Sequence, residues 1–145
     1  MGKFCTLLRL TSLQKKLTLE AFFWLAFARF QTKFFPFRKI APGLGTLSVG
    51  TPITPGRTQL ALAKQVGQAV RRMAKYTPWQ SKCLAQAMAA KRMLKHRGIP
   101  TTLYLGLGKD EEQQITAHAW LKYGDLVITG AGAMPSHAEI SAFYG

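Results

Sequence analysis

Gly98 and Pro100 mark the point where the pattern of the chain changes from helical to extended. Before this point, apolar residues recur every three or four positions, which predicts one helix over 58–76 and another over 83–96. After it, four segments are predicted as strands: 101–107, 115–123, 126–129 and 138–144. Helices followed by strands that short turns connect favour an α+β fold with an antiparallel sheet.

The N-terminal region is predicted as a third helix, over 11–35, which Thr11 or Ser12 can cap and Pro36 ends. Its predicted apolar stripe consists of Leu13, Leu17, Phe23 or Trp24, Phe27 and Phe30. Basic residues lie between them, and more phenylalanines follow. Such a face needs a partner, which is the rest of the domain, another protein or a membrane surface.

Composition divides the chain into three parts. Residues 1–40 form a basic, aromatic, helical segment, and residues 41–56 form a linker rich in proline and glycine. Residues 57–145 form the core that carries the chemistry. A chain of 145 residues is long enough for one domain with a modest core.

The formal net charge is +14 and is unevenly distributed. Residues 1–109 hold 19 basic residues and a single acid, Glu20, whereas residues 110–145 carry a net charge of −4. Such a surface attracts polyanions, acidic peptides or anionic lipid. The motifs of the common nucleic-acid-binding modules are missing, so nucleic acid is not a predicted partner.

Cofactors and compartment are judged from what the sequence lacks. Its two cysteines and three histidines show no spacing typical of metal ligands, and no glycine-rich loop has the residues of a phosphate-binding motif. No apolar segment reaches the roughly 20 residues that span a bilayer, and no signal peptide is recognisable. We therefore expect no cofactor and a cytoplasmic protein with reduced thiols.

Cys83 and His118 are the residues with which this chain could do chemistry. Cys83 begins a predicted helix, where unpaired backbone N–H groups and the helix dipole stabilise a thiolate or an oxyanion. His118 shares one face of its predicted strand with Trp120, and the two alanines beside it leave space. An inert cysteine is the alternative, but this pair matches a nucleophile and its general base.

Four stretches of the chain carry a family resemblance: Ser81-Lys82-Cys83-Leu84-Ala85-Gln86-Ala87, Leu94–Pro100, Leu103–Gly106 and Ala117–Leu121. Together they resemble the transglutaminase-like cysteine leader peptidases of lasso-peptide biosynthesis, the B proteins of those bacterial gene clusters. The resemblance covers residues 57–145, and His118 follows Cys83 by about 35 positions, as in that family.

The resemblance implies a papain-like, transglutaminase-type core in which the cysteine helix packs on a small antiparallel sheet. It implies removal of the leader peptide from a ribosomally made precursor, through a thioester on Cys83 with His118 as general base. The implied partners are the precursor peptide, a small leader-recognition protein and an ATP-dependent macrolactam cyclase. The basic N-terminal part, with its aromatic helix, is the expected docking element for the recognition protein.

The sequence departs from the family where an acidic residue commonly orients the histidine. That position, about a dozen residues after His118, reads Thr-Gly-Ala over 129–131. A two-residue hairpin loop at 124–125 would pair Thr129 with Trp120, on the face of His118, which makes the Thr129 hydroxyl a candidate third member.

Other candidates for the third member stay open. Asp125 would lie roughly 20 Å from His118 along extended chain, too far for a direct hydrogen bond. Glu139 and His137 could serve if the last segment folds back onto the sheet.

The residues before Cys83 are candidates for the substrate cleft. Trp79 and Gln80 could line the cleft or the oxyanion hole, and Trp120 could form its wall. Two rival functions remain: a peptide- or protein-binding scaffold with a degenerate core, and an acyltransferase that passes the thioester to an amine.

Overall fold

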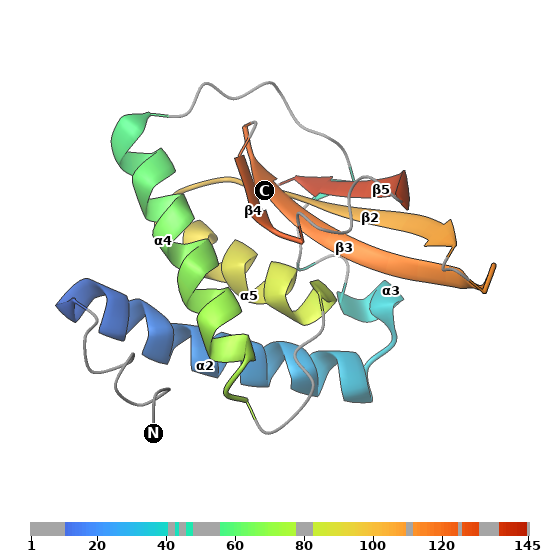
Figure 1. The fold of residues 1–145 in the computed structure, drawn as a ribbon, viewed down its shortest axis with the longest axis horizontal. Helices are drawn as coiled ribbons and strands as arrows, with labels where there is room; N and C mark the ends of the chain where they lie inside the picture. Colours follow the sequence, from blue (N-terminus) through green and yellow to red (C-terminus); the bar gives the residue numbers. More distant parts are fainter. Residues whose placement is uncertain are drawn as a thin grey trace.

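The computed structural model describes residues 11–40, 43, 46–47, 56–77, 83–109, 112–124, 126–130 and 137–144. Three long helices, α2 (Ser12–Phe34), α4 (Arg57–Ala74) and α5 (Cys83–Lys95), stack beside one sheet (Figure 1). Helix α5 packs against strands of the sheet on one side and against α2 on the other, and α4 contacts both α2 and α5. The cysteine helix is therefore the middle layer of the molecule.

The sheet is antiparallel and has the strand order β1-β5-β2-β3-β4. Its strands are β1 (Thr46–Leu47), β2 (Thr102–Lys109), β3 (Ile115–Tyr123), β4 (Leu126–Thr129) and β5 (His137–Tyr144). The predicted α+β fold with a small antiparallel sheet is confirmed. The sequence did not predict strand β1, which lies within the segment interpreted as a linker, or the short helix α3 (Phe37–Ile40).

Helix α2 begins and ends where its sequence predicts. Thr11 caps it through a reciprocal pair of hydrogen bonds: the Gln14 backbone N–H donates to Thr11 Oγ1 at 3.2 Å, and the Thr11 N–H donates to Gln14 Oε1 at 3.0 Å. The helix ends at Phe34, two residues before Pro36.

The inner face of α2 differs from the predicted apolar stripe. Its buried residues are Leu17, Thr18, Ala21, Leu25 and Ala28. The predicted stripe is right for Leu17 and, where it left Phe23 or Trp24 open, for Trp24, which packs partly buried against the core. It is wrong for Leu13, Phe27 and Phe30, which like Phe23 are 43% to 64% exposed. The alanines face the core because short side chains allow two helix backbones to approach closely, whereas phenylalanine rings at those positions would hold them apart.

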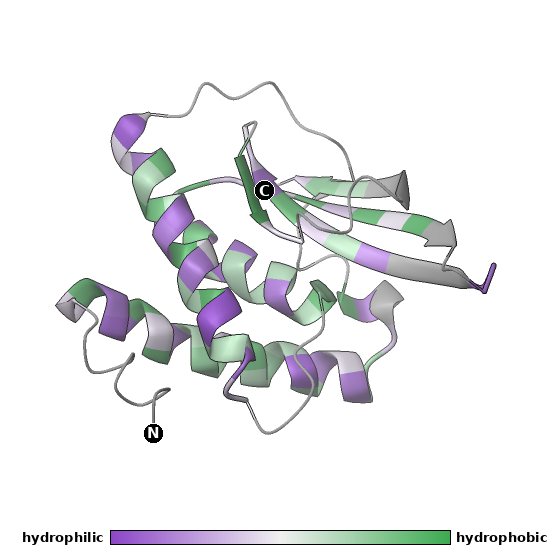
Figure 2. Cartoon of the chain, viewed as in Figure 1, coloured by the Kyte–Doolittle hydropathy of each residue, from purple (hydrophilic) through white to green (hydrophobic). Residues whose placement is uncertain are grey.

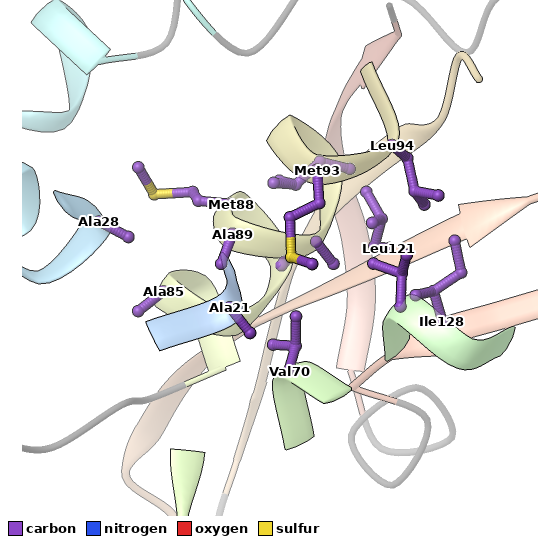
Figure 3. Close-up of a cluster of buried hydrophobic side chains, with 14 of the residues drawn as sticks. Ala21, Ala28, Val70, Ala85, Met88, Ala89, Met93, Leu94, Leu121 and Ile128 are labelled. Carbon is purple, nitrogen blue, oxygen red and sulfur yellow. The ribbon is translucent and has the colours of Figure 1, made fainter. Parts of the chain in front are cut away.

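Small residues also dominate the contact between α2 and α5. Figure 3 shows Ala21 and Ala28 of α2 close to Ala85 and Ala89 of α5, around the side chain of Met88. All five are at most 4% exposed. Helix α4, with its alternating hydrophilic and hydrophobic bands (Figure 2), turns its apolar face to the same core. Dense packing on both sides fixes the position of α5.

A bidentate ion pair joins α2 to the end of α5. Arg97 donates from Nη1 to Glu20 Oε1 at 2.8 Å and from Nη2 to Glu20 Oε2 at 2.6 Å. This contact with the Arg97 guanidinium holds the pKa of the Glu20 carboxyl below its usual value. Glu20, the single acid of the N-terminal 109 residues, is therefore paired with a basic residue of the same chain.

Lys91 of α5 is a basic residue whose side chain is buried away from water. Its side chain is buried, and its Nζ donates to the backbone carbonyl of Thr101 at 2.5 Å and lies 3.4 Å from Thr101 Oγ1. Burial, with a smaller effect from Lys95, lowers the pKa of Lys91 to about 8.

We expect Lys91 to make stability depend on pH in the alkaline range. Between pH 8 and 10.5 the unfolded chain keeps this proton while the folded protein has released it. The free energy of unfolding should therefore rise with pH in that window, by up to about 3 kcal/mol. Urea unfolding across this pH range should show the rise in the free energy of unfolding for the unaltered protein. Lys91→Met should lack the part of the rise that Lys91 contributes. Equal pH slopes for the two proteins would contradict the assignment.

Candidate active site

Cys83 is the first residue of α5, as the sequence predicts. Its thiol is free and half-buried, and the side chain packs at the margin of the hydrophobic core. At this end of the helix the first backbone N–H groups have no partner within the helix, so they can serve an anion in front of the helix. The residues just before it, 78–82, lie outside the described part of the chain.

The sulfur of Cys83 lies against the edge of β3. The backbone N–H of Ala119 donates a hydrogen bond to Cys83 Sγ at 3.3 Å. Strand β4 pairs with β3 from Tyr123 only as far as Leu121, so the edge of β3 at Ala119 lies beyond the end of β4. Cys83 Sγ and Gly130 thus both lie against Ala119 of β3, the sulfur at its N–H and the glycine near its oxygen.

This hydrogen bond brings Cys83 next to His118. The donating nitrogen belongs to the peptide unit that joins His118 to Ala119, and the Cα of His118 is two bonds away from it. The Cα of His118 therefore lies within about 6 Å of Cys83 Sγ, a distance that an imidazole can bridge. His118 is half-buried in β3, so its ring is partly shielded from water. This short backbone distance makes the thiol and the imidazole candidates for proton transfer.

The predicted pairing of Thr129 is wrong by one residue. The hairpin starts as predicted, with Tyr123 opposite Leu126, but the register then shifts and Thr129 lies opposite Leu121 instead of Trp120. The extra residue is Ile128, as in a β-bulge. Directly opposed residues share a face, so Thr129 joins the face of Leu121, which belongs to the hydrophobic core.

The hydroxyl of Thr129 consequently does not orient His118 in this structure. Its Oγ1 is buried and has no hydrogen-bond partner among the described groups. Gly130, the next residue, has a φ of +80°, and a Cβ added there would lie 2.5 Å from the backbone oxygen of Ala119. A side chain therefore does not fit at Gly130, the middle of the three positions, 129–131, where the resemblance leads us to look for an acid.

Strand β5 brings a different acidic residue into line with His118. Opposite His118 on β2 is Gly106, and opposite Gly106 on β5 is Glu139. The three residues form one row across the sheet, and residues paired in this way belong to the same face. The backbones at His118 and Glu139 are roughly 10 Å apart, and the residue between them has no side chain.

The other predicted site residues divide into described and undescribed ones. Trp120 is 4% exposed, and its ring stacks on that of Tyr104 with centroids 5.9 Å apart and planes at 9°. It is buried beside the row that contains His118, and its role as a cleft wall stays a prediction. Trp79, Gln80 and Asp125 lie outside the described residues.

Sequence reasoning missed two backbone features of the site. The amide of Ala119 binds the sulfur, and Gly106 separates His118 from Glu139. The alanines on either side of His118 were a signal for the first, since they leave room for a helix end. The second had no local signal, because it depends on pairings between strands that are distant in sequence.

Comparison with known proteins gives one match. Residues 31–141 match the family model of the transglutaminase-like superfamily. The matched range contains Cys83, His118, Gly106 and Glu139. No curated protein and no solved structure matches the chain.

Proposed function

Because the chain belongs to the transglutaminase-like superfamily, which generally includes cysteine-based enzymes, we propose that it is a cysteine peptidase acting on a peptide precursor. The observation that carries this proposal is the hydrogen bond between the Ala119 N–H and Cys83 Sγ. It brings a thiol at a helix N-terminus to the peptide unit of a strand histidine. An inert structural cysteine would not need a histidine at this place.

The substrate is the leader region of a ribosomally made precursor, as in lasso-peptide maturation. The sequence stretches around Cys83 and His118 support this specificity, and the basic surface of residues 1–109 suits an acidic peptide. A small leader-recognition protein would present the precursor, and an ATP-dependent macrolactam cyclase would take the product. The reaction would take place in the cytoplasm, where the precursor is made.

The first half of the reaction forms a thioester. His118 accepts the proton of the Cys83 thiol, and the sulfur attacks the carbonyl carbon of the scissile peptide bond. The unpaired N–H groups at the start of α5 stabilise the oxyanion. The C–N bond then breaks, His118 returns the proton to the departing amine, and the core peptide leaves with a free N-terminus. The leader remains as an acyl group on Cys83.

The second half releases the leader. His118 accepts a proton from water, whose oxygen attacks the thioester carbonyl. The C–S bond breaks, the leader leaves with a free carboxylate, and the proton returns to Cys83. An acyltransferase would use an amine in place of water at this step, and a scaffold would perform neither half.

Intact-mass analysis separates these three functions. The precursor is incubated with this protein and the recognition protein of its cluster, and the products are weighed. A peptidase yields a leader with a free carboxylate, an acyltransferase yields a leader amide, and a scaffold leaves the precursor intact. Recovery of the amide, or of intact precursor alone, would overturn the proposal.

We also propose that Glu139 positions His118. The register places Glu139 in the row of His118 with only Gly106 between them, and the order across the sheet is acid, histidine, cysteine. This backbone order matches that of catalytic triads, in which the histidine stands between an acid and the nucleophile. Thr129 lacks this relation because the bulge turns it to the core.

Glu139→Gln is expected to lower kcat for precursor cleavage about 10- to 100-fold, with little change in KM, because it removes the charge that orients His118. Glu139→Asp should recover part of the loss. Glu112→Gln removes an acid from the exposed turn before β3 and should leave kcat unchanged, which makes it the matched control. A change in KM without a fall in kcat, or an equal fall in kcat for Glu112→Gln, would contradict the positioning role.

A further inference from the structure

The outward side of α2 carries a continuous row of large apolar side chains. We call it the outer stripe, and it consists of Leu19, Phe23, Phe27, Phe30 and Phe34. Successive members are three or four positions apart, so they lie on one face of the helix. Their side chains are 43% to 64% exposed. The stripe is about 22 Å long at the rise of an α-helix.

The outer stripe leaves α2 apolar on two faces. The inner face is buried against α4 and α5, and hydrophobic residues predominate along the middle of the helix (Figure 2). A helix that is apolar all round is normally enclosed on all sides. Here α2 is the layer furthest from the sheet, with α5 between them (Figure 1), so its outward side faces away from the rest of the fold.

Positive charge accompanies the outer stripe. Lys15 and Lys33 are both exposed, and they lie five turns apart along the same side of the helix. The Nζ of Lys33 is 5.5 Å from the centroid of the Phe34 ring. Lys16 and Lys39 are also exposed. Glu20, the one acid of α2, is paired with Arg97.

The chemistry of this surface fits a lipid bilayer better than it fits the recognition protein that the sequence led us to expect on this helix. A protein interface needs about one hydrogen bond per 100–200 Å² of buried area, and the side chains of the outer stripe offer no donor or acceptor. An interfacial helix needs apolar side chains that enter the acyl boundary and lysines that reach back to the phosphates. No helix among the described residues is long and apolar enough to cross a membrane, so the contact would be with the surface.

We infer that the outer stripe docks on an anionic membrane surface, with α2 parallel to the plane of the bilayer. The phenylalanines enter the boundary between head groups and acyl chains, and Lys15 and Lys33 bind lipid phosphates. This inference stands on the exposure and charge of α2 alone. It holds whether or not Cys83 is a peptidase nucleophile.

Vesicle flotation tests the inference on the full chain. The protein should float with vesicles made of equal parts phosphatidylcholine and phosphatidylglycerol, and bind at least about tenfold more weakly to phosphatidylcholine alone. Added salt should weaken the binding to the anionic vesicles. Absence of binding, or equal binding to both kinds of vesicle, would overturn the inference.

Two variants locate the contact. Phe23→Ser/Phe30→Ser should reduce vesicle binding at least about tenfold, because two rings no longer enter the bilayer. The control is Leu107→Ser, which replaces an exposed apolar residue on β2 and should bind as the unaltered protein does. Equal binding by Phe23→Ser/Phe30→Ser and the unaltered protein would overturn the inference.

The charge pair provides a test that leaves the apolar residues in place. Lys15→Glu/Lys33→Glu should reduce binding to anionic vesicles about tenfold or more. Lys64→Glu/Lys75→Glu changes the net charge equally, at exposed positions on and just after α4, and should have a much smaller effect. Equal losses would show binding by net charge alone. A dimer that Phe23→Ser/Phe30→Ser dissociates would show that a second copy covers the stripe. Either result would overturn the inference.

Discussion

Cys83→Ala should abolish cleavage of the precursor peptide, with a fall in rate of at least about four orders of magnitude. The thioester forms only through this sulfur, and neither the helix N-terminus nor His118 can replace a nucleophile. The change removes one atom at the half-buried end of α5, so the fold should persist. The measurement is the rate of product formation by intact mass, with circular dichroism to verify folding.

His118→Ala should cause a loss of similar size, because the thiol and the imidazole act as a unit. The double variant Cys83→Ala/His118→Ala should then be no slower than either single variant. Two substitutions are suitable controls: Cys5→Ala removes the other cysteine of the chain, and His96→Ala removes a histidine just after α5. Both should keep their activity. Cleavage by Cys83→Ala at a substantial rate would refute the assignment of the nucleophile.

Gly130→Ala is expected to destabilise the protein by about 3 to 5 kcal/mol. The residue has a φ of +80°, which disfavours any L side chain, and the added Cβ would also lie 2.5 Å from the Ala119 oxygen and 2.9 Å from the Trp120 Cα. Backbone atoms at both contacts cannot rotate away, so β3 or the end of β4 must move. Urea unfolding measures the loss.

Gly98→Ala separates strain from collision. Gly98 lies three residues after the end of α5 and has a φ of +72°, close to that of Gly130, but a Cβ there meets nothing within 4 Å. Gly98→Ala should therefore lower the free energy of unfolding only through the unfavourable backbone conformation, by about 1 to 2 kcal/mol. If both substitutions lower the free energy of unfolding by the same amount, the close approach of Gly130 to β3 does not contribute to the loss.

The same collision has a consequence for engineering the site. An aspartate at 130, within the three positions 129–131 where the resemblance leads us to look for an acid, should fail to supply a partner for His118, because it would displace the strand that holds the histidine. Without a side chain, Gly130 allows the end of β4 to approach β3 closely. The acid that we propose instead is Glu139, which lies on the other side of His118 in the row across the sheet.

Local sequence pattern predicted the main elements of the fold well. The helices α2, α4 and α5 and the strands β2 to β5 begin and end within two residues of the predicted bounds. Their signals are local: a capping threonine at 11, a proline after the helix at 36, alternation along β3. Helix α3 and strand β1 were missed because segments of four and two residues are too short to show a period.

Packing and register were predicted less well, for physical reasons. The aromatic residues of α2 are its most hydrophobic, yet the alanines face the core, because close approach of helices depends on size as well as on hydrophobicity. The shift at Ile128 cannot be seen in the hairpin sequence. It accompanies the contact of Ile128 with Gly67 of α4, where a Cβ would lie 2.7 Å from the Ile128 oxygen. The row of His118 and Glu139 likewise depends on β5 pairing with β2.

Because α5 is the middle layer of the molecule, the reactivity of Cys83 should depend on how completely the chain has folded. The helix that carries the thiol contacts α2, α4, β2, β3 and β4, so the position of the thiol beside β3 depends on packing against elements that precede and follow it in the chain. A newly made or partly unfolded chain would hold the same cysteine away from its histidine. The proposed peptidase activity would therefore require the folded chain, and the cysteine would not be activated before folding is complete.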